Sequence, residues 1–322
     1  MDEKKLMLAQ EELKAKIEVI AQNVGGDGSL NMAMLANMPY DAELPIPDVI
    51  SKICKVARVE KGEPYEYFSI SPETKTVYTI SNGGVTQANV TPDTDNDLTF
   101  YSYNGPAENV YIEKLMEAKY DPIAVKAKAI MEALNRKETK HVLDVVIASA
   151  EGQSKTYDFT SGESTLTFTK LEEMTRGIEL YGTKFALITG STVSSDIRLL
   201  NFNADKNQAI KLADLGIEEW IPVSQFTYTH STSMTVMAAD KAILVALSDS
   251  EDERPVHFVR RKIVDVFNQG QSKERIIVAS GPRLAVGSTP KWAYEIAVME
   301  QYGVVQPNPY ACAVYQRAST YA

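Results

Sequence analysis

One segment constrains the fold of this chain more than any other. Residues 66–105 contain two runs with strand character, 66–80 and 98–103, separated by two glycines, a proline and the polar cluster 93–97. The segment has no helical period. Loops or arms of about 40 residues are uncommon inside a compact domain, and they usually bind something. We therefore predict a strand-rich arm with a binding role.

Composition narrows the class of protein. The 322 residues are enough for two domains or one large one, and 44% hydrophobic residues allow a substantial core. A net charge of −10 argues against tight, sequence-independent binding to nucleic acid. Neither a membrane span nor a signal peptide is expected. Cys54 and Cys312 form no disulfide framework or zinc cluster, so we expect small buried side chains and a reducing site of folding.

The first half of the chain is predicted to be arm-like and helical. Apolar residues at helical spacing predict an N-terminal amphipathic helix that ends near residue 25, and an extended proline-containing arm is predicted to follow to residue 47. A long helical region is predicted to start at residues 105–106 and to restart after Asp121-Pro122, with a further helix over 138–149.

The second half is predicted to mix strands and helices. The pattern predicts a hairpin from 157–159 and 165–168, a helix over 171–181, buried strands over 185–189 and 242–247, and a short helix over 209–214. Further strands are predicted over 256–267, 275–279, 284–287 and 294–302. This order favours the α+β class over repeated βαβ units.

No pattern for catalysis, cofactor or metal binding emerges. His141, His230 and His257 are isolated, which is typical of structural histidines. Residues 177–184 resemble a phosphate loop, but a helix is predicted before them and a strand after, the reverse of what phosphate binding needs. Residues 93–97 begin like a calcium loop but lack its glycine and its final glutamate, so a solvated tip is favoured over a weak cation site. The charged run 249–254 is interpreted as a solvated turn. We expect no cofactor and no enzyme activity.

The layout and three short segments resemble a known family. The segments are 171–190 (LEEMTRGIELYGTKFALITG), 240–247 (DKAILVAL) and the turn 303–311 (GVVQPNPYA). Together with the arm and the long helix, they resemble the major capsid protein of tailed bacteriophages, whose fold is shared with encapsulins and the herpesvirus capsid floor. The resemblance implies an N-terminal arm (1–48), an extended β-hairpin loop (66–105), a peripheral domain with a spine helix (49–65, 106–139 and 250–302) and an axial domain (140–249 and 303–322).

The resemblance also implies a function and partners. The chain would self-assemble, as pentamers and hexamers, into an icosahedral or prolate capsid shell around double-stranded DNA, without sequence-specific binding. It would be a virion component assembled in the host cytoplasm, with separate scaffolding, portal and decoration proteins as further partners. Covalent crosslinking is not predicted. The alternatives are an encapsulin-like nanocompartment shell, another virion structural protein such as a tail protein, and a soluble α+β enzyme.

The arm and the N-terminal stripe supply the expected contacts between subunits. A two-stranded ribbon is marginal alone in water, so it would be ordered by lying on a neighbour. Aromatic and β-branched side chains suit such contacts. The stripe could be covered by a neighbour, by a scaffold or by its own domain. The predicted contact residues are Tyr67, Phe68, Ile70, Val77, Tyr78, Ile80, Phe100, Tyr101, Tyr103, Leu13, Ile17 and Ile20.

Overall fold

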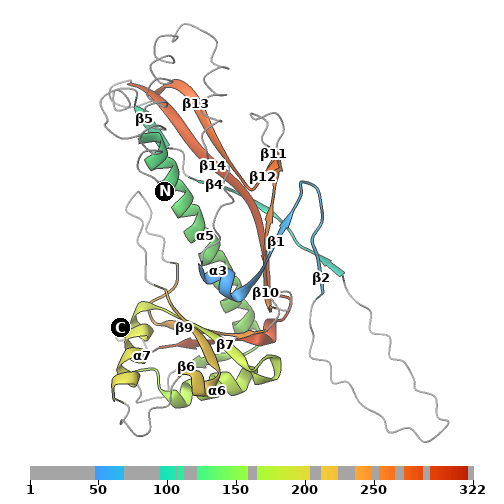
Figure 1. The fold of residues 1–322 in the computed structure, drawn as a ribbon, viewed down its shortest axis with the longest axis vertical. Coiled ribbons are helices and arrows are strands. Elements are labelled where there is room, and N and C mark those ends of the chain that lie inside the picture. Colours follow the sequence, from blue (N-terminus) through green and yellow to red (C-terminus); the bar gives the residue numbers. More distant parts are fainter. Residues whose placement is uncertain are drawn as a thin grey trace, which may run out of the picture. The chain divides into compact units, whose positions relative to one another are not determined.

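The computed structural model divides the chain into two compact units (Figure 1). It describes residues 48–68, 95–105, 108–111, 122–158, 165–203, 212–223, 236–248, 254–264, 272–285 and 291–317. The first unit comprises Met1–Pro45, Tyr101–Asn135 and Arg261–Tyr302, and the second comprises Ile46–Phe100, Arg136–Arg260 and Gly303–Ala322. The predicted N-terminal helix, the extended arm to residue 47 and the tip of the strand-rich arm lie outside the described residues.

The first unit is built around one long strand. β14 (Lys291–Val305) pairs antiparallel with β13 (Arg275–Ala285) and also with the short strands β4 (Tyr101–Asn104) and β5 (Glu108–Tyr111). A small ladder joins β11 (Ile263–Val264) to β12 (Ser272–Lys273). The core of this unit joins the sheet to the start of helix α5 (Pro122–Gly152) and consists of Val110, Ile130, Leu134, Ile296 and Val298.

Two expectations for this region are wrong. No helix begins at residues 105–106, because Glu108–Tyr111 forms β5 and pairs with residues 293–296 of β14. Val110 and Tyr111 are the β-branched and aromatic types that suit a sheet. Residues 138–149 do not form a separate helix, because they belong to α5, which is continuous from Pro122 to Gly152. Between those two ends α5 contains neither proline nor glycine.

The second unit contains a mixed five-stranded sheet. Its order is β6 (Thr156–Asp158), β15 (Cys312–Gln316), β9 (Lys241–Leu247), β7 (Lys184–Thr189) and β8 (Ile217–Pro222). β7 and β8 are parallel, and α7 (Ser191–Asn203) and the 3-10 turn η2 (Leu212–Leu215) lie between them in the chain. The helix α6 (Phe168–Ile178) and the turn η1 (Glu179–Tyr181) precede β7.

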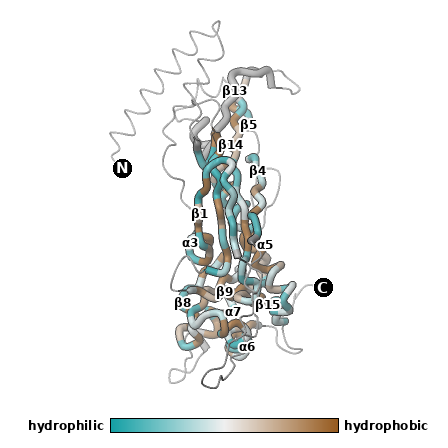
Figure 2. The backbone as a smooth tube through the Cα atoms, turned by 90° about the vertical axis from the view of Figure 1, so that its right-hand side faces the viewer, coloured by the Kyte–Doolittle hydropathy of each residue, from teal (hydrophilic) through white to brown (hydrophobic). Residues whose placement is uncertain are grey.

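The core of the second unit lies between this sheet and its helices. Buried residues of α6, β7, α7, β9 and β15 form one cluster, and Figure 2 shows hydrophobic stretches around β9, β15 and α6. The predicted buried strands over 185–189 and 242–247 are confirmed as β7 and β9, and the helix over 171–181 is confirmed as α6 with η1. The two cysteines are fully buried, as expected.

The predicted hairpin over 157–168 is wrong. β6 pairs in parallel with β15 instead, and Phe168 begins α6. The physical reason is the helix cap: the side chain of Thr167 accepts a hydrogen bond from the Lys170 amide, which satisfies a free donor of the first turn. α7 and β8 were not anticipated at all.

The second unit also contains a short helix, a 3-10 turn and several strands outside the five-stranded sheet. α3 (Asp48–Ile53) leads into β1 (Cys54–Val59), which neighbours β10 (Val256–Arg261). β2 (Glu66–Phe68) pairs with β3 (Asp95–Asp97), and the turn η4 (Pro309–Ala311) leads into β15. The predicted strands over 256–267 and 294–302 correspond to β10 with β11 and to β14, and the two strands predicted over 275–279 and 284–287 are parts of the single strand β13. The α+β class is therefore confirmed, whereas the predicted domain boundaries stay a prediction.

Candidate assembly surfaces

The base of the predicted arm is a two-stranded ribbon. β2 and β3 pair antiparallel, with Glu66 opposite Asp97 and Tyr67 opposite Asn96. The amide of Leu98 donates to the carbonyl of Tyr65 at 2.9 Å, which closes the base. Two carboxylates directly opposite each other on a ribbon repel, so this ladder has little stability of its own.

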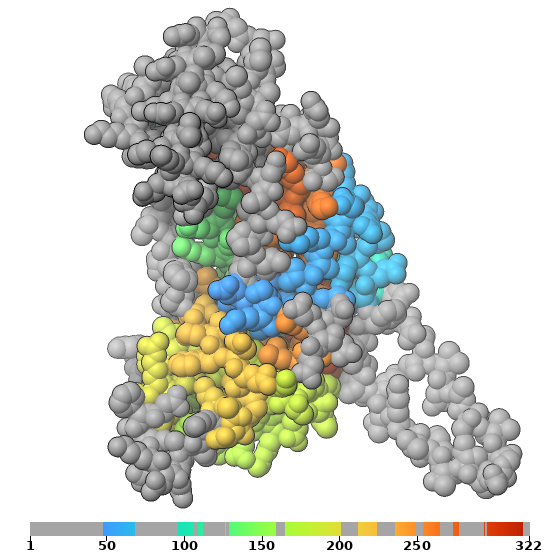
Figure 3. All heavy atoms as spheres, viewed as in Figure 1, coloured from blue at the N-terminus to red at the C-terminus, as the bar shows by residue number. Residues whose placement is uncertain are grey.

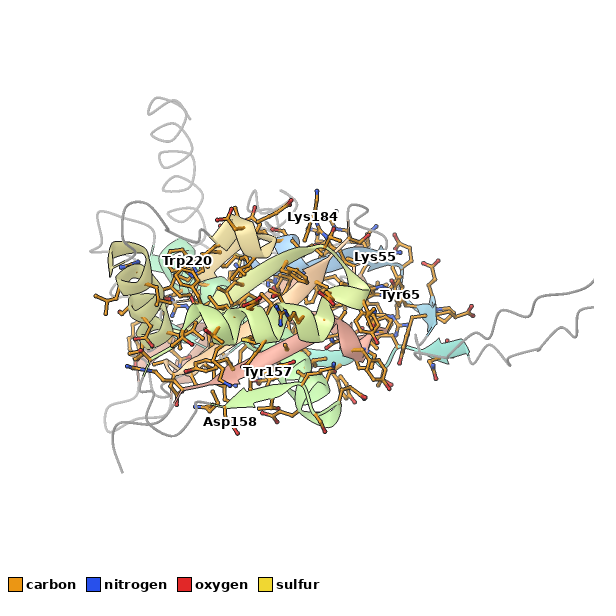
Figure 4. All side chains as sticks on the ribbon, turned by 90° about the horizontal axis from the view of Figure 1, so that it is seen from below. Lys55, Tyr65, Tyr157, Asp158, Lys184 and Trp220 are labelled. Atoms are coloured by element: carbon orange, nitrogen blue, oxygen red, sulfur yellow. The ribbon has the colours of Figure 1, made fainter. Side chains whose placement is uncertain are left out.

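Tyr65 ties this ribbon base to β10 of the same unit. Its hydroxyl lies 3.1 Å from Nδ1 of His257 on β10, and the two rings meet edge to face at 6.0 Å. Figure 4 shows Tyr65 on the side of the unit from which the ribbon extends. His257 thus has a structural role, as expected for an isolated histidine.

The structure places only some of the predicted contact residues. Ile70, Val77, Tyr78, Ile80, Leu13, Ile17 and Ile20 lie outside the described part, and for Phe68 only the backbone in β2 is described. Tyr67 and Phe100 are half-buried, and Tyr101 is 56% exposed. Tyr103 stacks on Tyr302 with ring centroids 4.1 Å apart and packs on the core of the first unit. Tyr103 therefore serves its own unit, and the contact role of the whole set stays a prediction.

The large hydrophobic side chains that lie exposed in the described chain are Tyr101, Leu180 and Leu199. Leu180 in η1 is 88% exposed and Leu199 in α7 is 55% exposed. Sequence reasoning missed both. Helical spacing could have flagged Leu180, because it falls on the face opposite Leu171, Met174 and Ile178, which are buried. No comparable signal existed for Leu199, since α7 itself was not predicted.

Buried polar contacts fix the second unit. The guanidinium of Arg260 on β10 donates to both carboxylate oxygens of Glu138 on α5, at 3.0 and 2.8 Å, and the two side chains are 2% and 0% exposed. In the sheet, the indole of Trp220 donates to the Thr189 hydroxyl at 2.9 Å. A bidentate pair and a bonded indole have one preferred geometry each, so they hold their elements in a unique arrangement.

A comparable buried pair lies in the first unit. Arg275 of β13 and Glu300 of β14 are opposite each other in the ladder, and their side chains form an ion pair that is almost fully buried. The pair joins two neighbouring strands of the same hairpin. Its role is therefore to fix the register of this hairpin rather than to bind a ligand.

Among the described residues, the pKa shifts of the two thiols and of His141 have structural causes. Burial raises the pKa of the Cys54 thiol strongly and raises that of Cys312 to about 12, so neither is a ready nucleophile. Burial, helped by the charge of Lys137, lowers the pKa of His141. A helix precedes residues 177–184 and a strand follows, which confirms that their context is the reverse of a phosphate loop.

In the part of the chain that the structure describes, no group of three or more His, Cys, Asp or Glu side chains is arranged to hold a metal ion, and Asp95–Asp97 forms β3. Among the described helices, none is long and apolar enough to span a membrane.

Comparison with known proteins identifies the fold. No protein-family model matches the chain, and no curated protein sequence matches it. Solved structures do match. The structure of the capsid of the cyanophage P-SCSP1u is similar over 89% of this chain and 94% of its own, with a TM-score of 0.51 and 11% identity. The asymmetric unit of the bacteriophage PhiM1 mature capsid matches over 87% of this chain and 90% of its own, with a TM-score of 0.51 and 10% identity.

A third structure agrees with these two. A chain from Microbacterium phage Oxtober96 is similar over 88% of this chain and 96% of its own, with a TM-score of 0.53 and 12% identity. The chain therefore has the α+β fold of phage capsid proteins. The resemblance stated from the sequence is confirmed at the level of the fold.

Proposed function

We propose that this protein is the major capsid protein of a tailed bacteriophage, a structural subunit that self-assembles into the shell around the viral DNA. The observation that carries the proposal is the likeness to two capsid structures over almost the whole chain, 89% in one case and 87% in the other. A fold alone does not define a function. The architecture of this chain adds independent support.

The ribbon at Glu66–Phe68 and Asp95–Asp97 supports assembly. It is marginal in isolation because like charges face each other, and its sequence continues into aromatic and β-branched residues outside the described part. A segment of this kind becomes stable when it lies on another surface. In a shell of identical subunits, that surface belongs to a neighbouring copy.

The alternatives fare less well. The likeness to three phage structures favours a virion role over a nanocompartment shell. An enzyme would need a set of catalytic groups, and the two thiols of this chain are buried with raised pKa values. Under this proposal the protein acts mechanically, resides in the virion and has itself as its main partner. Scaffolding, portal and decoration proteins would be separate chains.

Negative-stain electron microscopy of the purified chain, combined with size-exclusion chromatography, tests the proposal. We expect closed shells, or rings of the pentamer and hexamer type. Particles that contain DNA would support a phage capsid, and particles that contain a host enzyme would favour the nanocompartment. A discrete monomer or dimer at every salt and crowding condition would refute a shell role.

A further inference from the structure

Basic side chains gather on one side of helix α5. At about 100° per residue, positions 136, 137, 140 and 141 fall within an arc of roughly 140°. Glu138, Val142 and Val146 occupy the other side of the helix and are buried. The side that faces away from the core carries a basic stripe, which consists of the half-buried residues Arg136, Lys137, Lys140 and His141.

The basic stripe is an exception in an acidic chain. The whole chain carries 33 Lys and Arg against 43 Asp and Glu. Residues 126–141 of α5 instead contain five Lys and Arg against two acids, Glu132 and Glu138. Glu138 is buried and paired with Arg260, and Glu132 lies about 140° around the helix from Lys137. Positive charge therefore predominates on this side of the helix.

Asp144, which lies one turn beyond Lys140, reduces this charge only in part. Its carboxylate lies 2.8 Å from Nζ of Lys140, and the two side chains are 51% and 34% exposed. An exposed pair contributes little to stability, so Lys140 can exchange Asp144 for another anion. Burial lowers the pKa of His141, and the charge of Lys137 lowers it further and outweighs the opposing charge of Asp144. The electrostatic potential at the basic stripe is therefore positive.

The composition of the basic stripe favours a polyanion over another protein surface. Figure 3 shows atoms of α5, coloured green, at the surface. In the described chain the exposed large hydrophobic side chains are Tyr101, Leu180 and Leu199, and none of them lies on α5. Interfaces between proteins centre on aromatic or aliphatic anchors and are depleted in Lys. Arg and Lys are instead the side chains that contact the phosphates of nucleic acid.

We propose that the basic stripe of α5 contacts the phosphate backbone of the duplex DNA inside the shell, weakly and without sequence preference. This inference rests on the proposed function, which supplies DNA as the partner. Arg136, Lys137 and Lys140 supply three permanent charges, whereas the His141 imidazole is mostly uncharged at neutral pH. Three phosphate contacts give a salt-sensitive attraction that suits DNA which must be packed and released. The contact places this side of α5 at the inner surface of the shell.

The salt dependence of DNA binding counts these contacts. The unassembled full chain is titrated into a short fluorescent duplex of mixed sequence, and binding is followed by anisotropy. With a slope of about 0.9 per contact, three contacts should lower the affinity about 40-fold between about 50 and 200 mM salt. The double variant Lys137→Gln with Lys140→Gln keeps one contact and should lose only about 3–4-fold over that range. The matched control, Lys170→Gln with Arg176→Gln, removes two charges from α6 and should behave as wild type.

His141 provides a second and independent measurement, because it belongs to the basic stripe. The pKa values of the histidine rings are measured by NMR with and without the duplex, and the His141 signal is assigned with His141→Gln. Bound phosphates should raise the pKa of His141, since nearby negative charge favours the protonated ring. The pKa of His257, which is bonded to Tyr65, should not change. If DNA binds and the pKa of His141 stays the same, the DNA lies elsewhere and the inference is overturned.

The outcomes separate this inference from the proposed function. Normal shells, together with equal salt dependence for the stripe variant and the α6 control, would overturn the DNA contact while leaving the capsid role intact. A wild-type chain that forms no particle or ring would overturn the proposed function, and the genome contact with it. If the stripe variant bound DNA as wild type does but formed no shells, the basic stripe would belong to a contact between copies, and the DNA contact would again be overturned.

Discussion

Replacing Glu138 by glutamine should destabilise the second unit severely. Both carboxylate oxygens of Glu138 accept hydrogen bonds from Arg260, and neither side chain is more than 2% exposed. Glutamine keeps the shape but removes the charge, so the buried Arg260 guanidinium faces a neutral amide in place of the Glu138 carboxylate. Breaking a buried pair on one side costs roughly 3–5 kcal/mol.

Urea unfolding of the unassembled chain measures this loss. The protein has two tryptophans, so a Trp292→Phe background leaves Trp220 as a fluorescent reporter of the second unit. With a urea dependence of roughly 2–3 kcal/mol per molar, the midpoint should fall by about 1–2 M. The double variant Glu138→Leu with Arg260→Met should recover most of the loss, because it removes both charges of this pair.

An exposed pair in the same unit is the matched control. On α6, Nη2 of Arg176 lies 2.6 Å from Oε1 of Glu172, and the two side chains are 71% and 47% exposed. Glu172→Gln removes the same charge in water and should cost at most about 0.5 kcal/mol. If Glu138→Gln shifted the urea midpoint no more than Glu172→Gln does, the reasoning from burial would be refuted.

Three further predictions concern stability and reactivity. Gly177→Ala would place a methyl group 2.0 Å from the Tyr157 hydroxyl oxygen, so it should cost about 1–3 kcal/mol of stability and lower the melting temperature. Gly152→Ala is the control, because no atom lies within 4 Å of its new methyl group, and it should be near neutral. Equal melting temperatures for the two variants would contradict this packing. Burial raises the pKa of Asp196 above its ordinary value of 3.8, against the opposing charge of Arg317, so the folded state favours the protonated acid. The free energy of unfolding should therefore fall as pH rises from 3.8 to the raised pKa. Asp196→Asn should lack this pH dependence in thermal melts between about pH 3 and 6, and a difference between wild type and variant that stays constant with pH would exclude it. The two buried thiols should resist a thiol reagent at about pH 8 until the chain is unfolded in urea, and fast labelling of the folded chain would show that they are accessible.

Sequence reasoning succeeded where the local pattern and the tertiary environment agree. β7 and β9 are neighbours inside the five-stranded sheet and buried on both faces, so their sequences are continuous apolar runs that can be recognised alone. The arm 66–105 was predicted because a long segment without helical period is rare, and beyond its base the arm stays a prediction. Its base is paired as β2 and β3.

It failed where a distant partner decides the local structure. Residues 108–111 are a strand because β14 offers them a free edge, and β14 lies about 180 residues further along the chain. β6 likewise pairs with a distant partner, the parallel strand β15. The first five residues of α7 (STVSS) are all Ser, Thr or Val, which are weak helix formers. The helix forms nevertheless, because Val193 and Ile197 complete the core.

The assembly surfaces show the same limit. Helical spacing over 171–181 could have flagged Leu180, whereas Leu199 stands out only when α7 is known to exist. The aromatic residues of the arm could be proposed as contacts from composition, but Tyr103 has a partner of its own in Tyr302. Interfaces between copies depend on what the single chain leaves uncovered, and that is fixed by the fold.

The most direct test of the capsid role is electron cryo-microscopy of whatever the purified chain assembles into. We predict a closed shell made of this chain alone, in which the ribbon that starts at Glu66–Phe68 and Asp95–Asp97 lies on a neighbouring copy. A particle in which each ribbon packs only on its own chain, or a preparation that holds no assembly larger than a dimer, would contradict the account.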